Sequence, residues 1–245
     1  MAKPFDFAVV IPMANEGKEF KPFVDVMRDT LDQMNSGSVY FVVDHASKDN
    51  TLALCEALSK RDKRFKTLWA PENRHVVDAY LAGYKAALKN KHRLIIEMDA
   101  GLSHDPRALP MFLRVLNEGN ECAFGSRFMN GGSIYDSTWT RTFLSKFGTF
   151  LSNVLLGTRL YDATSGYQGF HASIVKKFLT HGLKSEAHFY QTEMRYLLRK
   201  TRFAEVPIHY RAPSPSVSKK AIQNSIAVLM YYFWLRIQRK APLIL

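Results

Sequence analysis

Cysteine is scarce in this sequence, which excludes one way of holding a chain of this size together. The 245 residues include two cysteines, Cys55 and Cys122, and they lie far apart in the sequence. A disulfide framework requires several cysteine pairs, and a structural zinc site requires closely spaced ligands. The sequence therefore predicts a protein that is stabilised by its hydrophobic core and suits a reducing compartment.

Long apolar segments are also missing. The first twelve residues, MAKPFDFAVVIP, contain no long uncharged stretch of the kind found in secretion signals. Near the other end, Ile226 to Leu235 forms a run of ten apolar residues. A helix that spans a membrane needs about 20. Neither segment is therefore expected to cross a bilayer by itself.

Two glycine-rich nucleotide-binding motifs are absent. The first expected strand leads into PMANEG at residues 12–17, which holds one glycine where a dinucleotide-binding fold has G-x-G-x-x-G. The P-loop pattern G-x-x-x-x-G-K-[ST] does not occur anywhere in the chain. Any nucleotide would therefore have to be bound by side chains such as Glu16 and Asp44 rather than by a glycine cradle.

Acidic residues are rare at the C-terminal end, although the formal net charge of the whole chain is +12. From Arg195 onward, ten Lys or Arg residues stand against one acid, Glu205. A basic end suits an anionic membrane surface, a phosphorylated substrate or a nucleic acid, and it can also be a solvated face without a partner. Because no groove-reading or base-stacking motif accompanies it, nucleic-acid binding is not expected.

Short apolar runs alternate with amphipathic segments, as is typical of βαβ units. The expected strands are Phe7 to Ile11, Val39 to Val43, Phe65 to Trp69 and the run that begins at Leu94; the expected helices are Phe20 to about Met34, Thr51 to about Lys60, and one opened by Asn73-Arg74-His75. The pattern predicts an α/β fold with a mostly parallel sheet and helices on both faces. We expect one domain over residues 1–220 and a C-terminal helix and tail over residues 221–245.

Acids follow two of the expected strands directly. Asp44 ends the second strand, and Asp99 follows the apolar run that begins at Leu94. Open α/β sheets bind ligands outside the carboxyl ends of their strands, and Mg²⁺ and Mn²⁺ prefer oxygen ligands. Asp99 is therefore predicted to hold a divalent cation and, through it, a diphosphate. The alternative role of Asp99, a helix cap, is better filled by Asp105, which precedes Pro106.

Seven segments occur in the order seen in family 2 glycosyltransferases. They are VVIPMANE (9–16), VVDHASKDNT (42–51), NR (73–74), EMDAGLSHDP (97–106), GSRFMNGG (125–132), DATSGYQGF (162–170) and EVPIHYR (205–211). They most resemble the dolichol-phosphate, or polyprenyl-phosphate, mannosyltransferase group. The resemblance implies a GT-A type fold for nucleotide-diphospho-sugar transfer. It also implies inverting transfer of a hexose, mannose or glucose, from a GDP- or UDP-sugar to a polyprenyl or dolichyl phosphate.

The resemblance assigns one group of residues to the nucleotide sugar. These are Pro12, Ala14, Glu16, Asp44, Asp99, Ala100, Arg211 and Lys219, with Asp99 also as the metal ligand. Carboxylates at strand ends suit ribose hydroxyls and base N–H groups, which agrees with this assignment. The family usually has an aromatic residue in place of Ala14 and an Asp in place of His45. The choice between GDP and UDP therefore stays open.

The metal motif departs from the family pattern. The Asp-Xaa-Asp sequence would place a second acid at position 101, where this chain has Gly101, and Ser103 stands where Gln is common. Further donors are close by in His104 and Asp105. Three interpretations remain: a Mg²⁺ or Mn²⁺ ion held mainly by Asp99 and the substrate, neutralisation of the diphosphate by Arg and Lys, or a protein that has lost transfer activity.

A second group of residues is assigned by the resemblance to the acceptor phosphate, namely Arg127, Arg141 and Ser145. Arg127 follows the small-residue turn Gly125-Ser126, which allows close approach to a phosphate. Arg141 and Ser145 lie four residues apart on an expected helix over residues 139–156. A surface charge and a space-filling serine are the alternatives. With Asp99, the two arginines are the candidate catalytic residues.

An acceptor phosphate is already a nucleophile, so transfer to it needs no strong general base. Catalysis would consist of aligning its oxygen with the anomeric carbon while Asp99-bound metal, Arg211 and Lys219 stabilise the leaving diphosphate. A saccharide or protein hydroxyl as acceptor would need a base, for which the candidates are Asp99, Asp105 and Glu193. The third possibility is a non-catalytic nucleotide-sugar-binding protein, which Gly101 motivates.

The C-terminal end combines apolar, aromatic and basic residues. The aromatic-rich run from Ile226 and the basic residues Arg236, Arg239 and Lys240 suit a helix that lies in a membrane interface or docks onto a membrane protein. Packing on the protein's own core or on a second copy is the alternative. Residues 211–220 are expected to form a mobile loop over the diphosphate. The predicted location is cytoplasmic, at the surface of a membrane.

Overall fold

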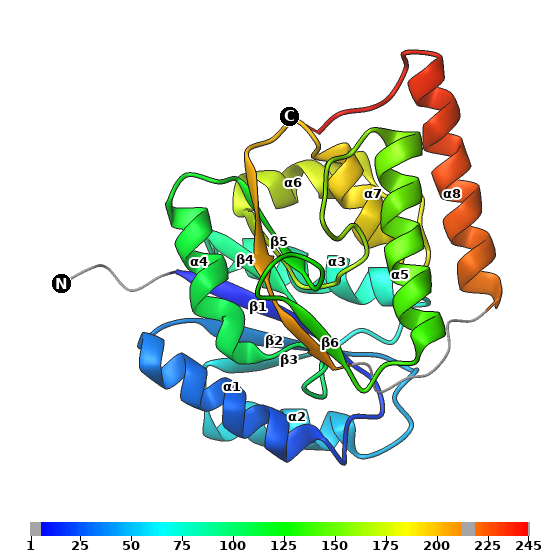
Figure 1. Cartoon of the computed structure of the whole chain (residues 1–245). Coiled ribbons are helices and arrows are strands. Elements are labelled where there is room, and N and C mark those ends of the chain that lie inside the picture. Colours follow the sequence, from blue (N-terminus) through cyan, green and yellow to red (C-terminus); the bar gives the residue numbers. More distant parts are fainter. Residues whose placement is uncertain (1–5, 212–218, 245) are drawn as a thin grey trace.

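The apolar runs of the sequence form strands, and the amphipathic segments between them form helices, as the α/β prediction requires. The computed structural model describes residues 6–211 and 219–244 (Figure 1). The strands are β1 (Phe7–Met13), β2 (Ser38–Val43), β3 (Phe65–Trp69), β4 (Leu94–Glu97), β5 (Cys122–Ser126), β6 (Ser133–Tyr135), β7 (Gln168–His171), β8 (Phe203–Pro207) and β9 (His209–Arg211). The helices are α1 (Phe20–Met34), α2 (Thr51–Arg61), α3 (Val76–Lys89), α4 (Leu109–Asn117), α5 (Trp139–Leu151), α6 (Ala172–His181), α7 (Tyr190–Leu197) and α8 (Lys219–Ile237).

Seven strands form one sheet in the order β3-β2-β1-β4-β7-β5-β8, and β6 pairs separately with β9. In the large sheet only β7 runs antiparallel to its neighbours, β4 and β5. Side chains alternate between two apolar layers, so that Ala8 and Val10 of β1 contact one layer while Phe7 and Val9 contact the other. Burial on both faces explains why these strands read as continuous apolar runs. The prediction of a mostly parallel sheet is confirmed.

Helices cover both faces of the sheet (Figure 1). Residues of α3, α6, α7 and α8 belong to one apolar layer, and residues of α1, α2 and α4 belong to the other. Cys122 lies in the first layer and Cys55 in the second, and both are free thiols. The sheet therefore separates the two cysteines and prevents them from pairing.

The chain changes direction across the sheet between β1 and β4. From β1 it winds outward through β2 to β3, and it then returns to place β4 on the other side of β1. The loops that follow β1 and β4 consequently leave the same edge and diverge. Such a switch point opens a crevice outside the carboxyl ends of the strands, where open α/β sheets bind ligands.

Strand β1 extends further than the sequence indicated. The expected end of the strand at Ile11 is wrong, because Pro12 and Met13 pair with Val42 and Val43 of β2. On the other side, the pairing of β1 with β4 ends where Val10 meets Glu97. Pro12 lies beyond this point, so its missing N–H does not interrupt a ladder with β4. The strand therefore carries the backbone two residues closer to the crevice.

Side chains cap the first turns of α3 and α5. Asp78, in the first turn of α3, accepts hydrogen bonds from the backbone N–H groups of Arg74 and His75, both at 2.9 Å. Thr138 precedes α5 and its Oγ1 accepts from the N–H of Arg141 at 3.3 Å.

The expected helix over residues 139–156 is α-helical to Leu151 and continues as one wide π-helical turn, Ser152–Leu156.

Helix α8 begins at Lys219, two residues before the expected domain boundary, and packs on the core with one side. Val228, Leu229 and Tyr232 are buried in the same layer as α3, and the Tyr232 hydroxyl donates to Glu193 Oε1 at 2.6 Å. Its exposed side carries Ile226, Tyr231, Trp234 and Ile237. Across residues 6–211 and 219–244, we found no helix with the length and apolar character needed to span a membrane.

Candidate active site

Hydrogen bonds join the loops that follow β1 and β2. The side chain of Asn15 donates to the carbonyl of Ala46 at 3.0 Å and accepts from the N–H of Lys48 at 2.8 Å. The N–H of Glu16 donates to Thr51 Oγ1 at 2.8 Å. These bonds hold the Pro12, Ala14 and Glu16 segment beside the loop that starts at Asp44. The predicted gathering of Glu16 and Asp44 at one edge of the sheet is therefore observed.

Asp99 follows β4 and reaches the crevice from its other side. The hydroxyl of Tyr80 donates to Asp99 Oδ1 at 2.9 Å, and the N–H of Asp99 donates to His104 Nδ1 at 2.9 Å. The Asp99 side chain is 38% exposed, so it is positioned by these contacts while it remains accessible. Its backbone and carboxylate are thus fixed by neighbours, and its carboxylate does not cap the next helix.

Glu16 lies close enough to Asp99 for the two carboxylates to affect each other. Burial, followed by the negative charge of Asp99, raises the pKa of Glu16 from its usual value to about 7. Two carboxylates that oppose each other's ionisation across a crevice are stabilised by a cation placed between them. Positive charge is therefore favourable beside this pair.

Gly101, two residues after Asp99, leaves room for the Glu16 carboxylate. Its φ of +65° is in the left-handed region, and a Cβ added to it would lie 2.7 Å from Glu16 Oε2. The Glu16 carboxylate therefore occupies the space into which a side chain at position 101 would extend. The glycine that breaks the Asp-Xaa-Asp pattern is the residue that admits Glu16.

The turn before β7 forms a wall beside Asp99. A Cβ added to Gly166 would collide with the side-chain amide of Gln191 and would lie 3.5 Å from Asp99 Oδ1. Gln191 is buried behind this glycine. The Gly166 backbone is therefore the surface that lies next to Asp99 here.

Arg127 is buried in an ion pair at the end of β5. Its Nε and Nη2 donate to the two oxygens of Asp162 at 2.7 and 2.9 Å, and Nη2 also donates to Thr164 Oγ1. Burial favours the neutral acid, but the Arg127 charge prevails and lowers the pKa of Asp162 to about 2. The positive charge of Arg127 is thus largely balanced within the protein, which the sequence did not indicate. Nη1 is not part of the pair.

Tyr210 joins the acidic and basic parts of the site. Arg141 Nη2 donates to the Tyr210 hydroxyl at 3.0 Å, and the Arg127 guanidinium carbon lies 5.4 Å from the centre of the Tyr210 ring. On its other side the Tyr210 ring packs against His104, with 5.0 Å between ring centres. Since His104 contacts Asp99, a continuous row of side chains connects Asp99 to both arginines.

The histidine in this row is neutral at physiological pH. Burial lowers the pKa of His104 to about 4, although the nearby Asp99 opposes this shift. Its Nδ1 accepts the backbone N–H of Asp99, so Nδ1 carries no proton. His104 therefore positions Asp99 rather than contributing a charge to the site.

The remaining predicted ligands differ in how close they lie to Asp99 and Arg141. Ser145 lies half-buried one turn after Arg141 on α5. The N–H of Arg211 donates to the carbonyl of Ser103 at 2.9 Å, which brings β9 against the Asp99 loop, while its guanidinium pairs with Asp136 at 3.1 Å. Lys219 is exposed at the start of α8, and most of the predicted loop, residues 212–218, lies outside the described residues.

Two of the three candidate bases are engaged elsewhere. Asp105 caps the 3₁₀ turn Pro106–Ala108 by accepting from the N–H of Arg107, as its position before a proline suggested. Glu193 is buried and accepts from the N–H groups of Lys184 and Ser185, both at 2.8 Å. A role for Glu193 as base or sugar ligand is therefore wrong, and Asp99 is the candidate that faces the crevice.

A buried polar network behind Asp99 was not foreseen. Gln168 donates to Glu97 Oε1 at 2.6 Å and accepts from Arg195 Nε at 2.9 Å. The three side chains are all buried. Tyr80 and Tyr210 were missed as well, because apolar spacing on α3 and a single tyrosine beside Arg211 carry no functional signal in the sequence.

The donor set fits a divalent cation that also binds substrate. Among residues 6–211 and 219–244 there is no cluster of three or more His, Cys, Asp or Glu side chains suited to a metal. Mg²⁺ is commonly bound by one or two carboxylates, with phosphate oxygens and water completing its shell. Asp99 and Glu16 meet this description at the crevice, where the diphosphate of a nucleotide sugar would supply the other oxygens.

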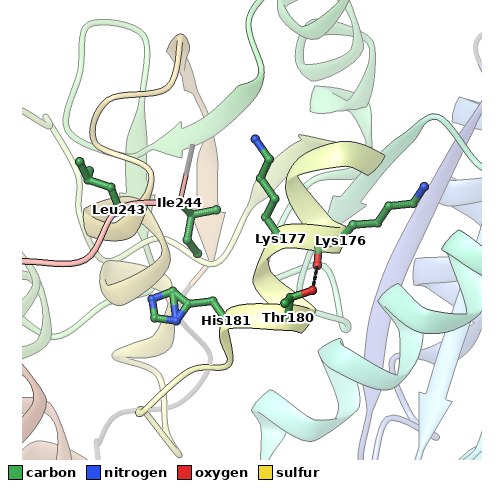
Figure 2. A pocket seen from close by; sticks show the side chains of 6 residues that line it. All are labelled: Lys176, Lys177, Thr180, His181, Leu243 and Ile244. Carbon is green, nitrogen blue, oxygen red and sulfur yellow. Dashed lines mark hydrogen bonds between the residues drawn. The ribbon is translucent and has the colours of Figure 1, made fainter.

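A second hollow lies away from these residues (Figure 2). It is lined by Lys176, Lys177, Thr180 and His181 of α6 and by Leu243 and Ile244 at the end of the chain. None of the predicted ligands contributes to it. The predicted ligands Glu16, Asp44 and Asp99 lie instead in the loops that follow β1, β2 and β4.

A family model and two characterised proteins that resemble this chain are all glycosyltransferases. The family model described as "Glycosyl transferase family 2" matches residues 8–179. The polyprenol monophosphomannose synthase of Mycolicibacterium smegmatis is 30% identical over 219 residues, 88% of this chain and 81% of that protein. The undecaprenyl-phosphate mannosyltransferase of Micrococcus luteus is 27% identical over 203 residues, 82% of each protein.

A solved structure shows the same fold. Glucosyl-3-phosphoglycerate synthase from Mycobacterium tuberculosis, in complex with Mn²⁺, uridine diphosphate and phosphoglyceric acid, matches with a TM-score of 0.64 at 13% identity. The match covers 98% of this chain and 79% of that one. At this identity the likeness concerns the fold alone, and it confirms the expected GT-A type architecture.

Proposed function

Because the chain belongs to glycosyltransferase family 2, we propose that it transfers a hexose, mannose in the first place, from a nucleoside diphosphate sugar to a polyprenyl phosphate. The observation that carries this proposal is the row of side chains from Asp99 through His104 and Tyr210 to Arg127 and Arg141. It brings the carboxylate of Asp99 near the guanidinium groups of Arg127 and Arg141. Two phosphate-bearing substrates need this arrangement.

The geometry suggests how the two substrates are separated. The nucleotide would lie over the edge formed by Pro12, Ala14, Glu16 and Asp44, with its diphosphate at Asp99. A divalent cation bound there would neutralise the diphosphate and assist its departure. The acceptor phosphate would lie by Arg141 and Ser145, with Arg127 behind them. Alignment of the phosphate oxygen with the anomeric carbon, on the face opposite the leaving group, leads to inversion.

The hydroxyl-acceptor alternative is less well supported by the site. Asp99 is the candidate base that faces the crevice, and the proposal already uses it for the cation. A phosphate acceptor requires no base at all, since it is ionised at neutral pH. The chemistry of the described residues therefore favours the lipid phosphate.

Helix α5 offers a surface for the membrane that holds such a lipid. Trp139, Phe143, Phe147 and Phe150 form an exposed aromatic ridge, and neighbouring ring centres lie 5.4, 5.7 and 6.4 Å apart. Trp139 is 78% exposed. Helix α8 lies next to the π-helical turn that continues α5, and Arg236 bonds the carbonyls of Val154 and Leu155 (Figure 1). Aromatic side chains with nearby basic residues suit a membrane interface.

Loss of the aromatic ridge should weaken membrane binding. The double variant Phe143→Ser/Phe147→Ser is expected to reduce partitioning onto phosphatidylglycerol-containing liposomes at least about tenfold, because each ring would otherwise leave water. Sedimentation with liposomes measures the bound fraction. Met111→Ser is the control, since Met111 is an exposed apolar residue of α4 on the other face of the sheet. Equal binding by the double variant and the wild type would remove α5 as the docking surface.

The proposed activity is tested by supplying both substrates. The protein is incubated with GDP-mannose, UDP-glucose or GDP-glucose, Mn²⁺ and a polyprenyl phosphate, and the lipid product is identified by mass spectrometry. We expect a hexosyl phosphoryl polyprenol with an inverted anomeric centre and no product from the phosphate-free polyprenol. Product from a saccharide or polyprenol hydroxyl would favour the alternative acceptor class. Nucleotide-sugar binding without any product would favour a non-catalytic protein.

A variant of Arg141 tests the proposed acceptor site. Arg141→Gln is expected to raise KM for the polyprenyl phosphate about tenfold or more, because a charge-assisted hydrogen bond to the phosphate is lost. KM for the nucleotide sugar should change little, since Arg141 lies on the acceptor side of Tyr210. Arg159→Gln, which removes an exposed arginine elsewhere, is the control. An equal rise in both KM values would place Arg141 outside the acceptor site.

A further inference from the structure

Position 101 is where this chain departs most clearly from the pattern that it otherwise resembles. Asp-Xaa-Asp would provide two carboxylates from one loop, and here the second is a glycine. If a cation is bound at Asp99 alone, the protein contributes a single charged ligand. The structure nevertheless contains a second carboxylate at this place, and it comes from the loop after β1.

Glu16 fills the space that Gly101 leaves open. The 2.7 Å separation between Glu16 Oε2 and a Cβ built on Gly101 means that a side chain at 101 and the Glu16 carboxylate cannot occupy their positions together. Glu16 is held from the other side by the bond from its N–H to Thr51 Oγ1. Its backbone is therefore anchored to the loop after β2 while its carboxylate points to the loop after β4.

The partners of Asp99 leave it suited to share a ligand with Glu16. Tyr80 occupies Oδ1 of Asp99, and Oδ2 lies 3.6 Å from His104 Nδ1, too far for a hydrogen bond. Two carboxylates from the loops after β1 and β4 then face the crevice at the switch point of the sheet. A divalent cation with hard oxygen ligands matches this donor set.

We infer that Glu16 takes the place of the absent acid at position 101 and, together with Asp99, holds the divalent cation that binds the diphosphate. The inference rests on the proposed function, since the remaining ligands of the cation are diphosphate oxygens. It gives Glu16 a different role from the ribose or base contact that the family resemblance implies. The two roles make opposite predictions about the linkage between metal and nucleotide.

The test measures binding rather than turnover. The dissociation constants of GDP and UDP are determined by calorimetry with Mn²⁺ and with EDTA, for the wild type, Glu16→Gln and Glu19→Gln. Glu19 is an exposed acid three residues away whose side chain makes no capping bond, so its variant removes the same charge from the same loop. Bound Mn²⁺ is counted separately by electron paramagnetic resonance, with and without nucleotide.

For the wild type and Glu19→Gln, we expect Mn²⁺ to tighten nucleotide binding about tenfold or more, within the usual range of such couplings. In Glu16→Gln this enhancement should fall below about twofold, and nucleotide-dependent Mn²⁺ binding should be lost. If Glu16→Gln weakens nucleotide binding by the same factor with Mn²⁺ and with EDTA, Glu16 contacts only the nucleotide and the inference is overturned. An unchanged enhancement overturns it as well. Absence of nucleotide binding by the wild type would instead count against the proposed function.

Discussion

Asp99→Asn is expected to lower kcat/KM for hexose transfer by about 10²- to 10³-fold, the range seen when one group that stabilises a developing charge is removed. An amide at this position still accepts the hydrogen bond from Tyr80 and keeps the N–H that bonds to His104. It no longer carries the charge that, in the proposed function, holds a cation against the leaving diphosphate. The loss should therefore fall on the chemical step rather than on folding.

Asp105→Asn is the matched control for this variant. Asp105 lies in the same loop but caps the turn that begins at Pro106, and asparagine also serves as a cap. Steady-state kinetics and thermal melting of both variants separate the two effects. Asp99→Asn with activity within about threefold of wild type, at unchanged melting temperature, would contradict the central place given to Asp99.

Arg127→Met is expected to destabilise the fold by about 3–5 kcal/mol, as is typical when one partner of a buried ion pair is removed. Asp162 would then be buried without its counter-charge, since both of its oxygens bind Arg127. The double variant Arg127→Met/Asp162→Leu removes both charges and should regain most of the lost stability. Urea denaturation gives the free energy of unfolding for the two variants and the wild type.

The pH dependence of the free energy of unfolding at acidic pH tests the Arg127–Asp162 pair independently. The pKa of Asp162 is about 2 in the folded protein, below the value of about 3.9 expected for an unfolded chain. The pair therefore contributes stability above about pH 4, and this contribution, about 2–3 kcal/mol, is lost as the pH falls toward 2. The double variant should lack this part of the acid dependence. A cost below about 1 kcal/mol for Arg127→Met would show that the pair is not important for the fold.

Much of the sheet, and of the edge at which the candidate site lies, could be predicted from the sequence. Apolar runs that end abruptly in an acid are recognisable without coordinates, and the βαβ alternation then places Asp44 and Asp99 at one edge. Capping signals such as Asp105-Pro106 are equally local. These predictions succeeded because each depends on residues that are neighbours in the chain.

Other parts of the site depend on contacts between distant segments. The partner of Arg127 lies 35 residues away, and the residue that fills the space above Gly101 lies in the loop after β1. No local pattern indicates either contact. The sequence also suggested a membrane surface at the C-terminal helix, whereas α8 buries Val228, Leu229 and Tyr232 and the larger exposed aromatic row is on α5.

Helix α5 carries the aromatic ridge and the proposed acceptor ligands on different faces, and their separation has a consequence for the lipid. Arg141 and Ser145 are each two residues from Phe143, which at about 100° per residue places them nearly opposite the aromatic ridge. A helix with its side chains is about 10 Å across. If the ridge rests on the bilayer, the phosphate must rise by about one helix diameter to reach Arg141. The first isoprene units would then be drawn out beside α5 while the rest of the tail stays immersed. Acceptors should accordingly be selected by the few carbons next to the phosphate and hardly at all by total chain length.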